Sequence, residues 1–76
     1  MGERFPSMRG AELDRIVRKL CGDPIRQKGS HRTFQGGNGP FTFAYHDGAE
    51  LSGSIVRRVL IVNIGLSPEE ARNEVN

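Results

Sequence analysis

Apolar residues in the first third of the chain recur at the spacing of one helical face. They occupy positions i, i+3, i+4, i+7 and i+8 and are Leu13, Ile16, Val17, Leu20 and Cys21. Charged residues fill most of the positions between them, as in an amphipathic helix that buries one stripe. Ser7 is a suitable N-cap, and Gly22 suits the left-handed residue that follows a helix. The pattern therefore predicts a helix from about Met8 to Cys21.

Three short segments with strand propensity follow this helix. Residues 25–28 and 31–35 are separated by a Gly-Ser pair, which allows a tight turn. The glycine-rich stretch 36–40 is unsuited to regular structure and predicts a hairpin loop. Residues 41–46 alternate, which places three aromatic residues on one face of a half-buried strand, namely Phe41, Phe43 and Tyr45.

The segment 54–64 is ambiguous, because its β-branched residues favour a strand while their arrangement does not. Pairs of apolar residues flank Arg57 and Arg58, and Gly65 suits a helix end, so we expect a helix. The two arginines belong either to a nucleic-acid surface or, by default, to the solvated face of that helix. The sequence Ser-Pro-Glu-Glu at 67–70 matches a capping box and predicts a short terminal helix.

The expected order of elements is α-β-β-β-α. Two helices can cover one face of a three-stranded antiparallel sheet, so we predict an α+β fold with a short extra C-terminal helix. Residues 8–76 are expected to form a single domain. Residues 1–7 lack periodicity and are interpreted as an N-terminal extension or a remnant of cloning.

Charge and cysteine content narrow the class of protein. The chain has 76 residues and a net charge of +2, with basic residues gathered in its first half and acidic residues near its end. This distribution favours a polyanionic partner about as much as it favours a solvated surface. The single cysteine excludes an internal disulfide and fits a reducing compartment. No signal peptide or membrane-length apolar run is recognisable, so we expect a cytoplasmic protein with no membrane partner.

One basic stretch carries the candidate binding chemistry. Arg26 and Lys28 fall on one face of a strand and, with Arg32, can contact phosphates. Gly29 and Ser30 can present backbone N–H groups to an anion, and Ser30 adds a hydroxyl. These five residues form the candidate RNA-binding set.

His31 stands next to this set and is the candidate catalytic residue. A histidine can accept or donate a proton near neutral pH. It can therefore deprotonate a ribose 2′-hydroxyl while nearby cations stabilise the charged transition state, without a metal. DNA lacks that hydroxyl and should resist cleavage. From the residues alone, a surface or packing role is the more frequent outcome for such a histidine.

The other titratable residues offer weaker candidates. His46 could supply a complementary acid, although a hydrogen-bonding role at a strand end is more common. Asp47 or Glu50 could pair with a histidine, but loop carboxylates are more often solvent-exposed. A metal site that includes Cys21 lacks short ligand spacing, so neither a metal nor another cofactor is predicted.

The basic stretch resembles the signature of the HicA (YcfA-like) toxin family. The resemblance begins with Arg-Gln-Lys-Gly-Ser-His at 26–31, followed by the aromatic Phe34. Further matching segments are residues 45–46, 48–51, 53–57 and 64–67. The resemblance as a whole extends over about residues 8–70. The chain departs from the family pattern in Asp-Pro at 23–24, in Ala44 where a proline is usual, and in its glycine-rich loop.

The resemblance implies a double-stranded-RNA-binding-like fold and a metal-independent endoribonuclease that cleaves messenger RNA and arrests growth. It implies that His31 is the essential residue and that a HicB-type antitoxin masks the site. We expect the free toxin to be a monomer. Two alternatives stay open: a non-catalytic RNA-binding module of the same fold, and a domain whose basic face binds an acidic protein.

Overall fold

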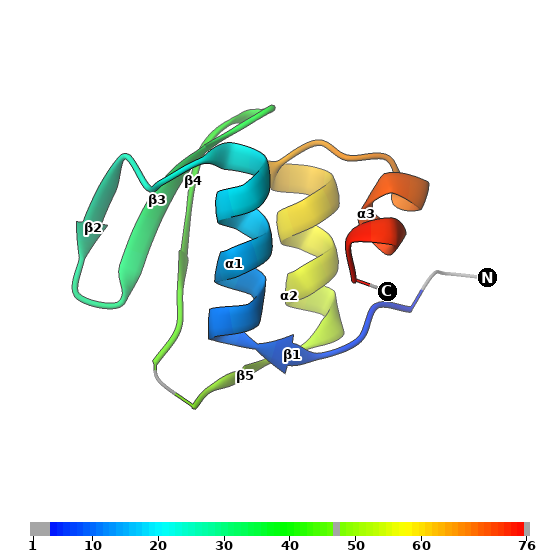
Figure 1. Ribbon diagram of the computed structural model, residues 1–76, viewed down its shortest axis with the longest axis horizontal. Coiled ribbons are helices and arrows are strands. Elements are labelled where there is room, and N and C mark those ends of the chain that lie inside the picture. The colour runs from blue at the N-terminus through cyan, green and yellow to red at the C-terminus, as the bar shows by residue number, and fades with distance from the viewer. Residues whose placement is uncertain (1–3, 47, 76) are drawn as a thin grey trace.

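The computed structural model describes residues 4–46 and 48–75 of the chain. It has an α+β fold in which helices lie against one side of a three-stranded antiparallel sheet of order β2-β3-β4 (Figure 1). In chain order the elements are β1 (Met8–Arg9), α1 (Gly10–Cys21), β2 (Arg26–Lys28), β3 (His31–Gly36), β4 (Gly39–Ala44), β5 (Glu50–Leu51), α2 (Gly53–Arg57), the π-helix η1 (Arg58–Asn63) and α3 (Pro68–Val75). Among these residues, no helix is long and apolar enough to cross a membrane.

The first helix begins later than predicted. Met8 and Arg9 instead form β1, which pairs antiparallel with β5, a two-stranded element that the sequence pattern did not predict. The predicted N-cap is also wrong, because the Ser7 hydroxyl donates to the Glu50 carboxylate at 2.7 Å. Arg9 occupies the cap position and makes no side-chain capping bond. The helix start is thus set by strand pairing between distant residues.

The other helix boundaries are close to those predicted. Gly22 has φ 83° and follows α1 as expected. Ser52 caps α2, with its hydroxyl accepting from the backbone of the first turn at 3.4 Å. α2 and η1 together confirm a helix where β-branched residues had favoured a strand. The capping box is confirmed by two reciprocal bonds, from Ser67 N–H to the Glu70 carboxylate (2.9 Å) and from Glu70 N–H to the Ser67 hydroxyl (3.1 Å).

The strands are joined by tight turns. Gly29, with φ 60°, lies in the turn between β2 and β3. The predicted loop 36–40 is wrong at both ends, because Gly36 pairs with Gly39 and Gln35 pairs with Pro40. The turn therefore contains residues 37–38 alone. At the other end, β4 stops before residues 45–46, which the alternation had placed in the strand.

The core lies between the helices and one face of the sheet. The alternation predicted for β4 is confirmed, since Phe41 and Phe43 are buried and both stack against Phe34, at 5.9 and 5.8 Å between ring centres. The largest fully buried side chains are Phe34, Leu13, Leu60, Val17 and Val56. Burying each such side chain contributes about 1.5–3 kcal/mol. The opposite face of the sheet is left open to solvent.

Candidate functional site

The open face of the sheet carries most of the predicted segment. Residues that pair across antiparallel strands share a face, and β2 places Lys28 opposite His31 and Arg26 opposite Thr33. β3 in turn places Thr33 opposite Thr42, and their hydroxyls are hydrogen-bonded at 2.8 Å. Two cations, one imidazole and two hydroxyls from three strands therefore lie on one surface.

These five side chains line a hollow of about 380 Å³, referred to below as the His31 cavity. Its volume is within the range of small-ligand sites, roughly 300–1,000 Å³. Arg26, Lys28 and His31 are exposed. Across residues 4–46 and 48–75, neither Arg26 nor Lys28 forms an ion pair, so both side chains can neutralise a bound anion. The structure therefore brings Arg26, Lys28 and His31 together in one cavity, as expected from the sequence.

Thr33 and Thr42 belong to the His31 cavity but were not named from the sequence. The period-2 rule already places Thr33 on the same face as His31, so that signal was available. Thr42 could be placed only once the register of β3 and β4 was known. That register follows from the length of the turn at 37–38, which the glycine-rich sequence concealed.

The structure separates Arg32 from the other residues of the predicted binding set. As a neighbour of His31 in β3, it points to the opposite face, and its side chain is only 14% exposed. Its Nε lies 3.2 Å from Oδ2 of Asp14, and its guanidinium lies 4.2 Å from the centre of the Tyr45 ring. The charge of Arg32 is therefore directed into the molecule.

Asp14 is the centre of a partly buried polar cluster. Its carboxylate accepts from Arg18 Nε at 2.5 Å and from the Tyr45 hydroxyl at 2.7 Å, in addition to pairing with Arg32. Burial raises the pKa of Tyr45, and the hydrogen bond to Asp14 raises it further. The hydrogen bond from Arg18 to the same carboxylate raises the pKa of that arginine.

This cluster also supports the turn beside His31. Arg32 donates from a terminal nitrogen to the carbonyl of Ser30 at 2.8 Å. The chain of contacts therefore runs from Asp14 through Arg32 to Ser30 and fixes the turn from the helix side. Gly29 and Ser30 lie in this turn, next to the His31 cavity but not among the residues that line it.

His46 and the acidic candidates lie apart from the cavity. His46 is exposed and does not line it, and its backbone carbonyl accepts from Ala49 N–H at 2.9 Å. Glu50 is engaged by the Ser7 hydroxyl, while Asp47 falls outside the described residues. Within the described ranges, no group of three or more His, Cys, Asp or Glu side chains could hold a metal ion.

Comparisons with known proteins identify no relative of this chain. No protein-family model matches it, and neither a curated protein nor a solved structure does. A function must therefore be inferred from the His31 cavity and from the sequence resemblance.

Proposed function

We propose that this protein is a HicA-like toxin, a metal-independent endoribonuclease that cleaves messenger RNA. The observation that carries the proposal is the position of His31, on an open sheet face with Lys28 directly opposite and Arg26 in the same cavity. The resemblance in residues 26–31 and the α+β order of elements support it. We interpret the architecture as double-stranded-RNA-binding-like.

In the proposed reaction, His31 acts as the general base. It removes the proton of a ribose 2′-hydroxyl, and the resulting oxygen attacks the adjacent phosphorus. The bond from phosphorus to the 5′-oxygen breaks, and that oxygen receives a proton from the imidazolium or from water. The products are a 2′,3′-cyclic phosphate and a 5′-hydroxyl end.

The remaining residues of the His31 cavity are proposed to hold the phosphate. Arg26 and Lys28 would neutralise the charge that develops on its non-bridging oxygens, an interaction that is strongest in the transition state. The hydroxyls of Thr33 and Thr42 can hydrogen-bond the same group. The turn at residues 29–30 would position these groups, and His46 would have at most a supporting role.

The exposure of the His31 cavity also fits the proposed regulation. All three residues of β2 are exposed, and β2 forms one edge of the sheet. A HicB-type antitoxin could therefore cover both this edge and the cavity without entering the core. Acidic groups on such a partner would pair with Arg26 and Lys28, and RNA would compete for the same cations.

One observation favours a second candidate, the non-catalytic RNA-binding module. In the described part of the chain, the His31 imidazole has no carboxylate or carbonyl partner to orient it, whereas catalytic histidines commonly have one. In this alternative the cavity binds RNA phosphates and the wild type does not cleave RNA. His31→Ala then weakens binding only slightly. The two candidates therefore differ in the covalent outcome for RNA.

Induced expression in a bacterial host tests the proposed function. The wild-type chain should arrest growth, and His31→Ala should not, because this variant lacks the general base. The substitution should leave the fold intact, because His31 is exposed. Gln27→Ala is the matched control, since Gln27 is exposed in β2 but does not line the cavity. Equal arrest by wild type and His31→Ala, at equal protein levels, would refute a toxin that depends on His31.

A further inference from the structure

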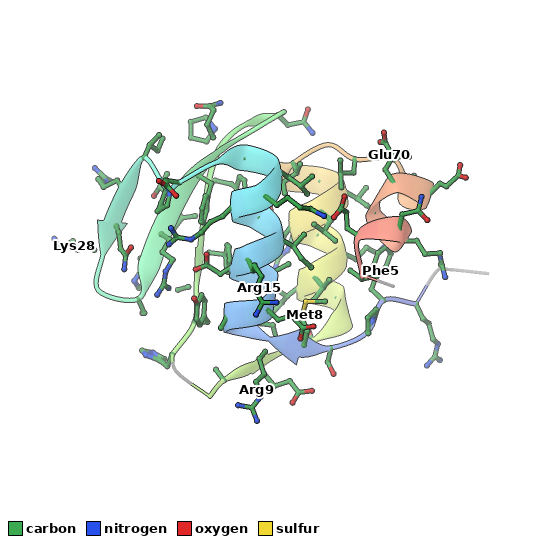
Figure 2. All side chains as sticks on the ribbon, viewed as in Figure 1. Phe5, Met8, Arg9, Arg15, Lys28 and Glu70 are labelled. Carbon is green, nitrogen blue, oxygen red and sulfur yellow. The ribbon has the colours of Figure 1, made fainter. Side chains whose placement is uncertain are left out.

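A second cavity shares no lining residue with the first. It has a volume of about 300 Å³ and is lined by Arg4, Phe5, Gly53, Ser54 and Arg57, and it is called the Arg57 cavity below. In Figure 2, Lys28 is labelled at the left edge of the molecule and Phe5 to the right of α1 and α2. The mechanism proposed above uses none of the residues of this second cavity.

The Arg57 cavity is formed because the N-terminal segment is held against α2. A side chain at Gly53 would collide with the backbone carbonyl of Phe5, so the close approach of the two segments requires glycine at this position. The Phe5 ring also lies 5.8 Å from the guanidinium of Arg72 in α3. The bond from Ser7 to Glu50 and the pairing of β1 with β5 fix the adjoining backbone.

The charges of this cavity favour an anion. Arg4 and Arg57 come from separate segments, are exposed, and form no ion pair within residues 4–46 and 48–75. Ser54 adds a hydroxyl, and no carboxylate is among the described residues that line the cavity. Two guanidinium groups and a hydroxyl around a hollow of this size match the donors that proteins use for phosphate.

The structure also distinguishes Arg57 from Arg58, two residues that the sequence assigned either to a nucleic-acid surface or to a solvated helix face. Arg57 lines the cavity, whereas Arg58 is exposed but does not. Adjacent helical positions point in directions about 100° apart, so the two side chains face different surroundings. Arg58 therefore serves as an internal control with the same charge and nearly the same place in the chain.

We propose that the Arg57 cavity binds a backbone phosphate of the RNA strand whose cleavage site lies in the His31 cavity. This inference rests on the proposed function for its ligand. It extends the RNA-binding surface from the outer face of the sheet to the junction of the N-terminal segment with α2. A strand long enough to reach both cavities binds more tightly than a short oligonucleotide held at the His31 cavity alone.

RNA binding measured as a function of salt concentration tests this inference. The measurement uses His31→Ala protein, so that the RNA stays intact, with Arg4→Gln, Arg57→Gln or Arg58→Gln added. Losing one phosphate contact should reduce the slope of log affinity against log salt by about 0.7 for a single strand. We expect that reduction for Arg57→Gln and for Arg4→Gln, and a smaller one for Arg58→Gln. With an oligonucleotide too short to span both cavities, all three variants should bind alike.

The outcomes separate this inference from the proposed function. Equal slopes for Arg57→Gln and Arg58→Gln on long RNA would overturn the inference, while cleavage by the wild type would still support the proposed function. A selective loss for Arg57→Gln in a protein that cleaves no RNA would support the second phosphate site and refute the catalytic proposal. No measurable RNA binding by any of these variants would overturn the inference, whereas only the absence of cleavage by the wild type would refute the proposed function. Circular dichroism of each variant tests whether the exposed substitution leaves the fold intact.

Discussion

At the scale of single residues, Asp14 connects the core to the candidate site. Its buried carboxylate is shared by Arg18, Arg32 and the Tyr45 hydroxyl, and Arg32 extends the connection to the Ser30 carbonyl. A buried carboxylate is tolerated only when it is paired and hydrogen-bonded, as it is here. Helical spacing places Asp14 among the charged positions outside the apolar stripe of α1, and Arg32 was predicted to contact RNA phosphates. Alternation along β3 directs Arg32 to the inner face, where it pairs with the buried Asp14.

Replacing Asp14 with asparagine should destabilise the protein by about 3 kcal/mol, because it leaves a largely buried guanidinium without its counter-charge. Urea unfolding at neutral pH measures the change in the free energy of unfolding. Glu12→Gln is the control, since Glu12 is an exposed acid in the same helix. A loss no larger than that of the control would contradict the role given to Asp14.

Tyr45 reports on the same cluster through its titration. It is the only tyrosine and the chain has no tryptophan, so alkaline absorbance follows this one phenol. Burial and the bond to Asp14 raise its pKa, so its titration midpoint should lie above that of free tyrosine, about 10. Because the folded-state pKa is the higher one, its stabilising contribution is complete below about pH 10 and is lost as pH rises through the folded value. A midpoint at or below that of unfolded protein would contradict this burial.

At the scale of elements, the end of η1 depends on the turn between β3 and β4. The last carbonyls of a helix lack partners within it. Here Gly37 N–H donates to the Ile64 carbonyl at 3.0 Å, Asn38 N–H to the Asn63 carbonyl at 3.4 Å, and Asn38 Nδ2 to the Val62 carbonyl at 2.8 Å. The turn therefore joins the sheet to the helix layer.

Asn38→Ala should cost about 1 kcal/mol in the free energy of unfolding, because the Val62 carbonyl loses a side-chain donor. Gln35→Ala is the matched control, since its amide donates at 3.3 Å to the carbonyl of the next residue and joins no second element. Thermal unfolding of the two variants compares them. Equal melting temperatures would show that the side chain of Asn38 does not help to hold the turn on the helix.

The elements that sequence could predict are those set by local patterns. The apolar stripe of α1, the alternation that buries Phe41 and Phe43, and the capping box at residues 67–70 all act within a few residues. The elements that were missed depend on distant partners. Pairing with Glu50 and Leu51 turns Met8 and Arg9 into a strand, and no nearby residue signals that pairing.

At the scale of the whole molecule, the separation of the two faces of the sheet explains the candidate site. The inner face carries the aromatic core, so the outer face can hold cations and hydroxyls without weakening it. The sequence could locate the cavity near residues 26–31, and alternation could have assigned Arg32 to the inner face. Thr42 also lines the cavity, but its position could be predicted only from the register of β3 and β4. The Arg57 cavity requires contact between the N-terminal segment and α2, which the local sequence does not encode.

Cleavage of RNA by the purified protein in the presence of EDTA tests the central claim most directly. The wild type should produce fragments with 2′,3′-cyclic phosphate and 5′-hydroxyl ends, because the general base and the cations of the His31 cavity suffice without a metal. The folded His31→Ala variant should leave the RNA intact, and a substrate with 2′-deoxyribose at the cleavage site should resist the wild type. Undiminished cleavage by His31→Ala, or of the 2′-deoxy substrate, would contradict the proposed mechanism. Binding without cleavage by the wild type would assign the protein to the non-catalytic class.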